Sequence, residues 1–264
     1  MLVLNDPAAR QAGSDSDAGS DADSDGLGSS DADSDADADV ESHVDSDEGA
    51  DDVLRAWRAE CPELRALWEE SAPMTEWAGV TFGEAGGADA GRVVEIKLEN
   101  KGLTGDVPAE QGGLTALTGL YLNGNELTSM PAELGGFTAL RTLYLSGNKL
   151  TSVPAELGCL TALTGLHLDR NRLTSVPAAL GGLIALSTLI LKKNQLTSVP
   201  AELGGLTALT FLSLRDNQLT SVPVELGGLT ALTSLDLREN QLTSVPAEWE
   251  EGGALEKSGC DIRR

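Results

Sequence analysis

The stretch LTGLHLDRNRLTSVP, residues 163–177, contains the pattern around which the rest of the chain is organised. Its spacing is L-x-x-L-x-L-x-x-N-x-L-x-x-V-P, and nearly the same spacing returns every 23 residues between Leu117 and Pro246. The asparagine keeps its place best and occurs six times at that interval: Asn125, Asn148, Asn171, Asn194, Asn217 and Asn240. A fixed period of this length predicts a solenoid in which each copy forms one coil.

The spacing within one copy indicates where the chain is extended and where it turns. Leu166 and Leu168 are two residues apart, so in a strand both side chains point to the same side, into the core. Asn171 follows where the chain turns, and its amide can pair backbone groups of neighbouring coils. Pro177 suits the first position of a short helical segment. One coil cannot cover its own apolar side, so the coils must stack on one another.

The pattern L-x-x-L-x-L-x-x-N resembles the leucine-rich repeat signature, and the resemblance covers about residues 77–260. It implies an α/β solenoid with a curved parallel sheet inside and short helical or 3-10 segments on the convex side. The phrase L-T-S-V-P-A-E-L-G-G-L-T-A-L resembles the intracellular Ras-group repeats, whose members are typically protein-binding scaffolds in signalling. This resemblance is specific for the fold and far less specific for the function.

Composition divides the chain into four parts. Residues 1–52 hold 17 carboxylates and one arginine, which is −16 of the formal charge of −24, and we expect a disordered acidic tail rich in Ser, Asp and Ala. Residues 53–92 have apolar side chains at helical spacing, which predicts a helical N-terminal cap. Residues 93–248 form seven repeat coils. Residues 249–264 form a C-terminal cap, in which Trp249 takes a core leucine position and Leu255 opens a last strand.

Two specific functions can be considered for the acidic tail. The run 21–26 matches the opening of an EF-hand loop, but Ala32 stands where that loop requires a bidentate glutamate. An aspartate follows three residues after several serines, as acidophilic kinases prefer: Ser14, Ser20 and Ser30. We expect a solvated polyanionic tail, and the alternative that it folds back onto basic residues of the repeats stays open.

The segment before the repeats resembles a cap of plant-type leucine-rich repeat proteins. Trp77-x-Gly-Val-x-Phe82, followed by a strand pattern from Val93, is similar to the W-x-G-V-x-C motif of that cap. Phe82 stands where that family has cysteine, so the cap disulfide is absent, which argues against a secreted receptor ectodomain. We expect Trp57, Trp68 and Trp77 to seal the end of the solenoid, with a ligand platform as the alternative.

Several function classes are disfavoured by the composition. The acidic charge makes nucleic acid a poor ligand, and no apolar run is long enough to span a membrane. Cys61, Cys159 and Cys260 have neither metal nor redox spacing, so we expect no metal, no cofactor and a cytoplasmic or nuclear location. The two histidines, His43 and His167, have no nucleophile at a matching spacing, so we expect no enzyme.

The predicted strands vary at their outward positions, and a partner would bind there. The position between the two inner leucines reads, along the stack, Lys97, Tyr121, Tyr144, His167, Ile190, Ser213 and Asp236. Tyrosine and arginine often dominate interface energies, although neighbouring coils also stack such side chains for their own stability. The sequence predicts a binding site for a protein partner on the concave sheet, made by Tyr121, Tyr144, His167, Arg170, Ile190, Lys192, Lys193, Phe211, Arg215 and Arg238.

The function that these observations favour is a monomeric protein-interaction scaffold or adaptor in intracellular signalling. A small GTPase or another signalling component is a candidate partner. Two alternatives remain open, which are a regulator of a GTPase or other enzyme and a fragment of a receptor-like ectodomain.

Overall fold

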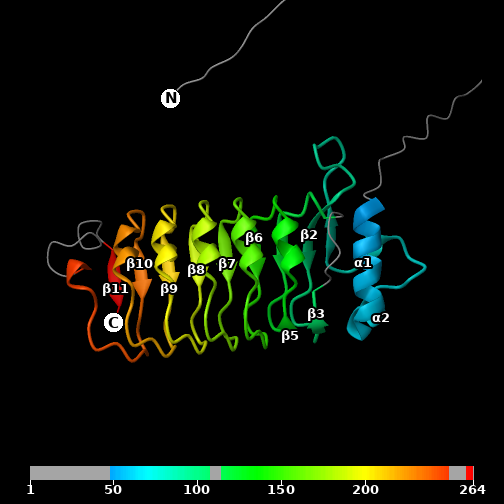
Figure 1. Cartoon of the computed structure of the whole chain (residues 1–264). Coiled ribbons are helices and arrows are strands. Elements are labelled where there is room, and N and C mark those ends of the chain that lie inside the picture. Colours follow the sequence, from blue (N-terminus) through cyan, green and yellow to red (C-terminus); the bar gives the residue numbers. More distant parts are fainter. Residues whose placement is uncertain (1–47, 108–113, 250–259, 264) are drawn as a thin grey trace, which may run out of the picture. The chain divides into compact units, whose positions relative to one another are not determined.

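The computed structural model describes residues 48–107, 114–249 and 260–263 (Figure 1). The predictions for the acidic tail up to residue 47 and for a strand at Leu255 lie outside these residues. Helix α1 begins at Glu48, so its first turn takes up the last residues of the predicted acidic segment.

Among the described residues, nine strands form one sheet in the order β1-β2-β4-β6-β7-β8-β9-β10-β11. Strand β1 pairs with β2 in the antiparallel sense, and the following pairs are parallel. The strands are β1 Val80–Phe82, β2 Val93–Lys97, β4 Gly119–Tyr121, β6 Thr142–Tyr144, β7 Gly165–His167, β8 Thr188–Ile190, β9 Phe211–Ser213, β10 Ser234–Asp236 and β11 Asp261–Arg263. This arrangement confirms the leucine-rich repeat solenoid.

The register of the sheet reproduces the 23-residue period. Leu143 lies opposite Leu166, which lies opposite Leu189, and the row continues in the same way through Leu212 to Leu235. All of these leucine side chains are fully buried. Burying one leucine contributes about 1.5–3 kcal/mol, and each coil supplies several, so stacking is the main source of stability in this fold.

In the six coils that begin between Leu117 and Leu232, the opposite side carries a short 3-10 helix that follows a proline. These helices are η2 Ala132–Gly136, η3 Ala155–Cys159, η4 Ala178–Gly182, η5 Ala201–Gly205, η6 Val224–Gly228 and η7 Ala247–Trp249. The first glycine of each pair allows the next coil to approach, because a Cβ on Gly135 would lie 2.5 Å from the carbonyl oxygen of Glu156. The second position is less crowded: nothing lies within 4 Å of a Cβ built on Gly136, whereas one on Gly182 would lie 3.0 Å from the carbonyl oxygen of Gly158. Cys159 occupies the equivalent place 23 residues after Gly136.

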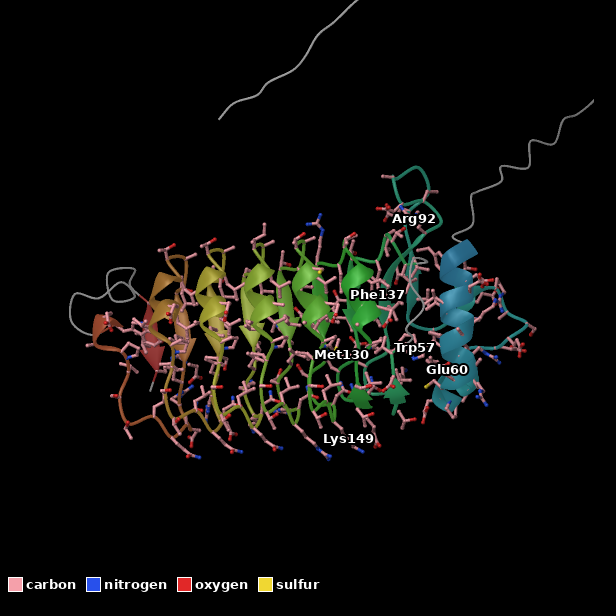
Figure 2. All side chains as sticks on the ribbon, in the orientation of Figure 1. Trp57, Glu60, Arg92, Met130, Phe137 and Lys149 are labelled. Atoms are coloured by element: carbon pink, nitrogen blue, oxygen red, sulfur yellow. The ribbon has the colours of Figure 1, made fainter. Side chains whose placement is uncertain are left out.

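Helices α1 (Glu48–Glu60) and α2 (Pro62–Leu67) and the 3-10 helix η1 (Met74–Glu76) cover the N-terminal end of the stack. Trp57, Trp68 and Trp77 are buried there, and Figure 2 shows Trp57 on the side of α1 that faces the coils. Trp68 stacks on Trp77 with ring centroids 4.8 Å apart. Its Nε1 donates to the carbonyl of Ala78 at 2.9 Å, whereas the buried Nε1 of Trp57 has no hydrogen-bond partner among the described residues.

The first and last coils depart from the repeat. Strand β3 (Thr104–Asp106) pairs in parallel with β5 (Glu126–Ser129) in a second, two-stranded sheet. At the other end, Ile262 of β11 lies opposite Leu235, 27 residues earlier. The repeat period of 23 would place Ser258 there, so β11 forms four residues later than the period predicts. Trp249 is buried, and its Nε1 donates to the carbonyl of Val224 at 3.2 Å.

Candidate protein-binding face

We use the term sheet face for the side of the nine-stranded sheet that points away from the leucine core, which is the predicted concave side. The strand register places its central residues in one row across the coils: Lys97, Tyr121, Tyr144, His167, Ile190, Ser213, Asp236 and Arg263. The predicted members Tyr121, Tyr144, His167 and Ile190 are therefore neighbours, and each is half-buried.

The aromatic part of this row is packed ring against ring. Tyr121 meets Tyr144 edge to face at 5.3 Å between centroids, and Tyr144 stacks on His167 at 3.8 Å with 6° between the planes. The Nζ atom of Lys97 lies 5.5 Å from the centre of the Tyr121 ring. These contacts hold the rings in place while leaving part of each accessible, so the row is a preformed apolar surface.

His167 has a perturbed acidity because of its place in this row. Burial lowers its pKa most strongly; the nearby carboxylate of Asp169 acts in the opposite direction, and the ammonium of Lys192 lowers the pKa further. The imidazole is therefore held in its neutral form near pH 7. A neutral ring can contact an apolar group without the cost of desolvating a charge.

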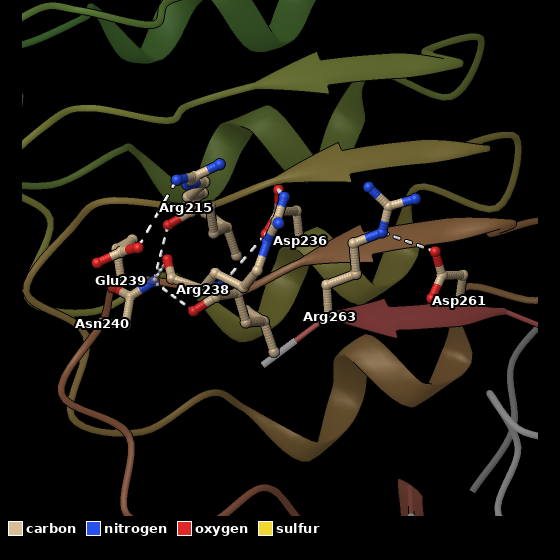
Figure 3. A network of polar contacts seen from close by, with 9 residues as sticks. Arg215, Asp236, Arg238, Glu239, Asn240, Asp261 and Arg263 are labelled. Carbon is tan, nitrogen blue, oxygen red and sulfur yellow. Dashed lines mark hydrogen bonds and ion pairs between the residues drawn. The ribbon is translucent and has the colours of Figure 1, made fainter.

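At β9 and β10 the central row of the sheet face is polar and buried, no longer aromatic and half-exposed. Ser213 and Asp236 occupy the central row but are buried, with 3% and 8% of their surface exposed. Arg238 donates two hydrogen bonds to the carboxylate of Asp236, at 2.9 Å and 2.7 Å, and these bonds lower the pKa of Asp236 (Figure 3). The guanidinium of Arg238, predicted to contact a partner, thus already has an internal partner. Phe211 is half-buried and lies in a neighbouring row, opposite Thr188 and Ser234.

The remaining predicted cations lie on three successive coils. The backbone N–H of Arg170 donates to the carbonyl of Lys192, and that of Lys193 donates to the carbonyl of Arg215. Arg170 lies 4.0 Å from a carboxylate oxygen of Asp169, and Arg215 lies 3.6 Å from one of Glu239 (Figure 3 shows the second pair). The structure brings the predicted basic cluster together and places an acid at each end of it, Asp169 beside Arg170 and Glu239 of the next coil beside Arg215.

The residue before each ladder asparagine adopts a left-handed backbone conformation. In two coils it is a glycine, Gly124 or Gly147, for which this conformation is easy. In the later coils it is a charged residue with φ between 56° and 58°: Arg170, Lys193, Asp216 and Glu239. Side chains with a Cβ are strained in this conformation, so these four coils carry their charges at a cost in backbone energy.

The asparagines themselves lie in the turns beneath the edge of the sheet. The Oδ1 atom of Asn171 accepts from the backbone N–H of Leu150 at 3.0 Å, and its Nδ2 donates to the carbonyls of Leu145 and Leu168. The carbonyl of Leu168 also accepts from Asn194 of the next coil. Each interior asparagine therefore joins two coils. The amides of this row are thus used for hydrogen bonds within the solenoid.

The described residues contain no group of three or more His, Cys, Asp and Glu side chains that could hold a metal ion. Within the same ranges, no helix is both long and apolar enough to cross a membrane. Cys61 is buried, Cys159 is exposed and Cys260 is half-buried, and all three are free thiols.

Models of two repeat families match the chain. The model described as "Leucine rich repeat" matches residues 161–219, and the model "Leucine Rich repeats (2 copies)" matches 115–159, 138–181 and 207–248. Together they cover residues 115–248, about half of the chain. The protein therefore belongs to the leucine-rich repeat family, whose domains typically bind other proteins and are not enzymes. No curated protein sequence matches the chain significantly.

Solved structures agree on the fold. The leucine-rich repeat ectodomain of the Arabidopsis thaliana receptor kinase GASSHO1/SCHENGEN3, in complex with CASPARIAN STRIP INTEGRITY FACTOR 2, is 27% identical with a TM-score of 0.51; the match covers 70% of this chain and 31% of that one. The BIR2 ectodomain of the same plant is 21% identical, with a TM-score of 0.51, over 79% and 98% of the two chains. This chain thus spans about a third of the length of the first of these ectodomains.

Proposed function

We propose that this protein is an interaction scaffold or adaptor whose sheet face binds one partner protein. The observation that carries the proposal is the row Tyr121, Tyr144, His167 and Ile190, whose large side chains are neighbours, fixed by their own packing and only half-buried. Preformed aromatic surface loses little entropy on binding and favours affinity. A signalling partner such as a small GTPase is the candidate that the resemblance to Ras-group repeats suggests.

We infer the Ras-group type for the coils between residues 117 and 246 from their repeated L-T-S-V-P-A-E-L-G-G-L phrase. We infer a plant-type cap from Trp77 and the strand that follows it. Phe82 stands at the cysteine position of such a cap and packs against the core. Together with three free thiols, this supports the proposal of a reducing, cytoplasmic or nuclear location.

The second candidate function is that of a receptor-like ectodomain fragment, and the likeness to a plant receptor ectodomain favours it. The two candidates predict the same binding face but different compartments. Fractionation of cells that express the tagged chain separates them: recovery with cytosolic markers supports the adaptor, and recovery with the secreted fraction supports the ectodomain fragment.

The binding face is tested by affinity capture with the full chain and two sets of variants. Tyr121→Ala with Tyr144→Ala removes the aromatic row. The matched control is Ile184→Thr with Val224→Ala, which replaces two exposed apolar residues outside the sheet by the residue that most other coils have there. We expect the first pair to lose the captured protein and the control to keep it. The reverse result would place binding on the side of the 3-10 helices and contradict the proposal.

A further inference from the structure

The cations of the sheet face differ in how far their charge is compensated. Four arginines and Lys97 have a carboxylate close by: Arg170 with Asp169, Arg215 with Glu239, Arg238 with Asp236, Arg263 with Asp261, and Lys97 with Glu95. Lys192 and Lys193, by contrast, lie within 4.0 Å of no carboxylate in the part of the chain that the structure describes. The coil of β8 therefore presents two adjacent ammonium groups that form no ion pair among the described residues. Asp169 and Asp216 hold the equivalent positions of Lys192 and Lys193 on the coils to either side, each without a salt bridge to them.

The backbone of this coil makes the second lysine costly. Lys193 has φ 56°, whereas the equivalent residue two coils earlier, Gly147, adopts φ 69° as a glycine. A glycine would relieve the strain at position 193. The lysine side chain makes no hydrogen bond within the described residues that would offset this strain, and the residue is exposed. Its charge is thus available for a contact outside the chain.

The lysine pair borders the apolar row. Ile190 precedes Lys192 by two residues and lies opposite His167, which stacks on Tyr144. Lys192 comes two residues after the end of β8, and its ammonium lies close enough to His167 to lower the pKa of that imidazole. Lys192 is therefore on the same side of the sheet as the row that contains His167 and Ile190. Apolar and cationic groups are therefore side by side on one rigid strand and the residues that follow it.

We propose that the β8 coil is the acid-binding end of the partner site, where Lys192 and Lys193 bind carboxylates of a partner segment whose neighbouring apolar side chain lies on Ile190 and His167. This inference rests on the proposed function and names the chemistry of the partner: an acidic-apolar protein segment. A basic segment is repelled at the same place, which gives the site selectivity. Lysine binds as a flexible point charge, so the contact weakens with added salt.

The probe for this inference is a fluorescein-labelled ten-residue peptide with two phenylalanines followed by two glutamates between glycines and serines. Its control replaces both glutamates by glutamine. The whole chain carries a charge of −24, so an acidic peptide gains nothing from long-range attraction and needs a local site. Fluorescence anisotropy with the full chain at low salt is expected to show about tenfold tighter binding of the glutamate peptide. The difference should shrink in 0.5 M salt, where the Debye length is about half of its value at physiological salt.

The matched variants are Lys193→Gly and Asp216→Gly, because both residues have φ 56° and neither has an ion-pair partner in the described ranges. Both should unfold at higher urea concentration than the parent, since glycine relieves the same strain. Only Lys193→Gly, and with it Lys192→Gln, should reduce glutamate-peptide binding to the level of the glutamine peptide. Asp216→Gly should leave binding unchanged or strengthen it.

Three results would overturn the inference: no binding of the glutamate peptide up to millimolar concentration, equal binding of both peptides, or lysine variants that bind as the parent does. Failure of the proposed function looks different. If both peptides bind equally and Tyr144→Ala abolishes the binding, the sheet face is a binding face without an acid-selective end. If the Tyr121 and Tyr144 variants keep the captured protein, the sheet face itself is the wrong surface.

Discussion

The imidazole of His167 lies flat on the phenol ring of Tyr144, with 3.8 Å between the ring centroids. This geometry joins two neighbouring coils through a stacked pair of rings. Burial lowers the pKa of His167, so the folded protein resists the protonation that the unfolded chain accepts near its usual pKa of about 6.5. The pH of the solution therefore acts on the same stack that we propose as part of the binding face.

We expect the free energy of unfolding to fall as the pH drops below about 6.5, because the unfolded chain then binds a proton that the folded state takes up only at lower pH. Above that pH both states are neutral and His167 has no effect. Urea unfolding at pH 7.5 and pH 5.5 measures the difference. His167→Gln should lose most of this pH dependence, whereas His43→Gln should retain it. A His167→Gln protein with the slope of the parent would show that other groups are responsible.

Replacing an asparagine of the row by alanine should lower the free energy of unfolding more in the middle of the stack than at its C-terminal end. Asn171→Ala leaves the buried N–H of Leu150 without its acceptor and removes one donor from each of two carbonyls, which should cost about 2–3 kcal/mol. Asn240 makes the same kinds of contacts but is only half-buried, so water can replace its amide in Asn240→Ala. We expect a cost of about 1 kcal/mol there. Equal losses in urea unfolding would mean that water reaches both sites alike.

The glycine pairs of the 3-10 helices give a test of close packing between coils. Gly135→Ala places a Cβ against the carbonyl oxygen of Glu156 and should destabilise the fold by about 1–3 kcal/mol. Gly136→Ala meets open space and should be neutral or stabilising by up to about 1 kcal/mol, because alanine restricts the unfolded chain. Thermal or urea unfolding of the two single variants decides between these outcomes. A tolerated Gly135→Ala would show that consecutive coils can move apart without loss.

Substitution by phenylalanine should lower the free energy of unfolding by different amounts at the tryptophans of the N-terminal cap. Trp68→Phe loses the hydrogen bond from Nε1 to Ala78 and part of the stack on Trp77. Trp57→Phe removes an Nε1–H that is buried without a partner, so the lost apolar surface is partly offset by the removal of an unsatisfied donor. We expect Trp68→Phe to be more destabilising by about 1–3 kcal/mol. The comparison needs only urea unfolding, and the opposite order would imply an ordered water on Trp57.

The sequence alone was sufficient for the repeated part of the fold, because a 23-residue period with paired leucines can bury its apolar side in few other ways. It also predicted that Tyr121, Tyr144, His167 and Ile190 are neighbours, since equal spacing makes equal register. It did not predict that β11 forms four residues late, because the last coil has no further copy to fix its length. The 23-residue spacing therefore could not predict where β11 begins.

The electrostatics of the sheet face could not be predicted from spacing. Arg238 and Arg215 have carboxylates within reach and Lys192 has none among the described residues; those carboxylates come from other positions of the same or the next coil, such as Asp236 and Glu239. Side-chain length and rotamer decide such pairs, and the repeat pattern carries no information on either. The left-handed residue before each asparagine was also hidden, since glycine marks it in some coils and a charged residue in others.

The shared register of the coils has a consequence for how such a protein can change over generations. Any two consecutive interior coils meet through the same leucine rows, glycine contacts and asparagine bridges, so a recombination event that gains or loses 23 codons would lengthen or shorten the sheet by one strand without creating a new kind of junction. The two ends, with Trp57, Trp68 and Trp77 at one and Trp249 at the other, are not interchangeable in this way. The length of the sheet can thus change by whole coils, whereas the chemistry of the sheet face changes only by substitution of single residues.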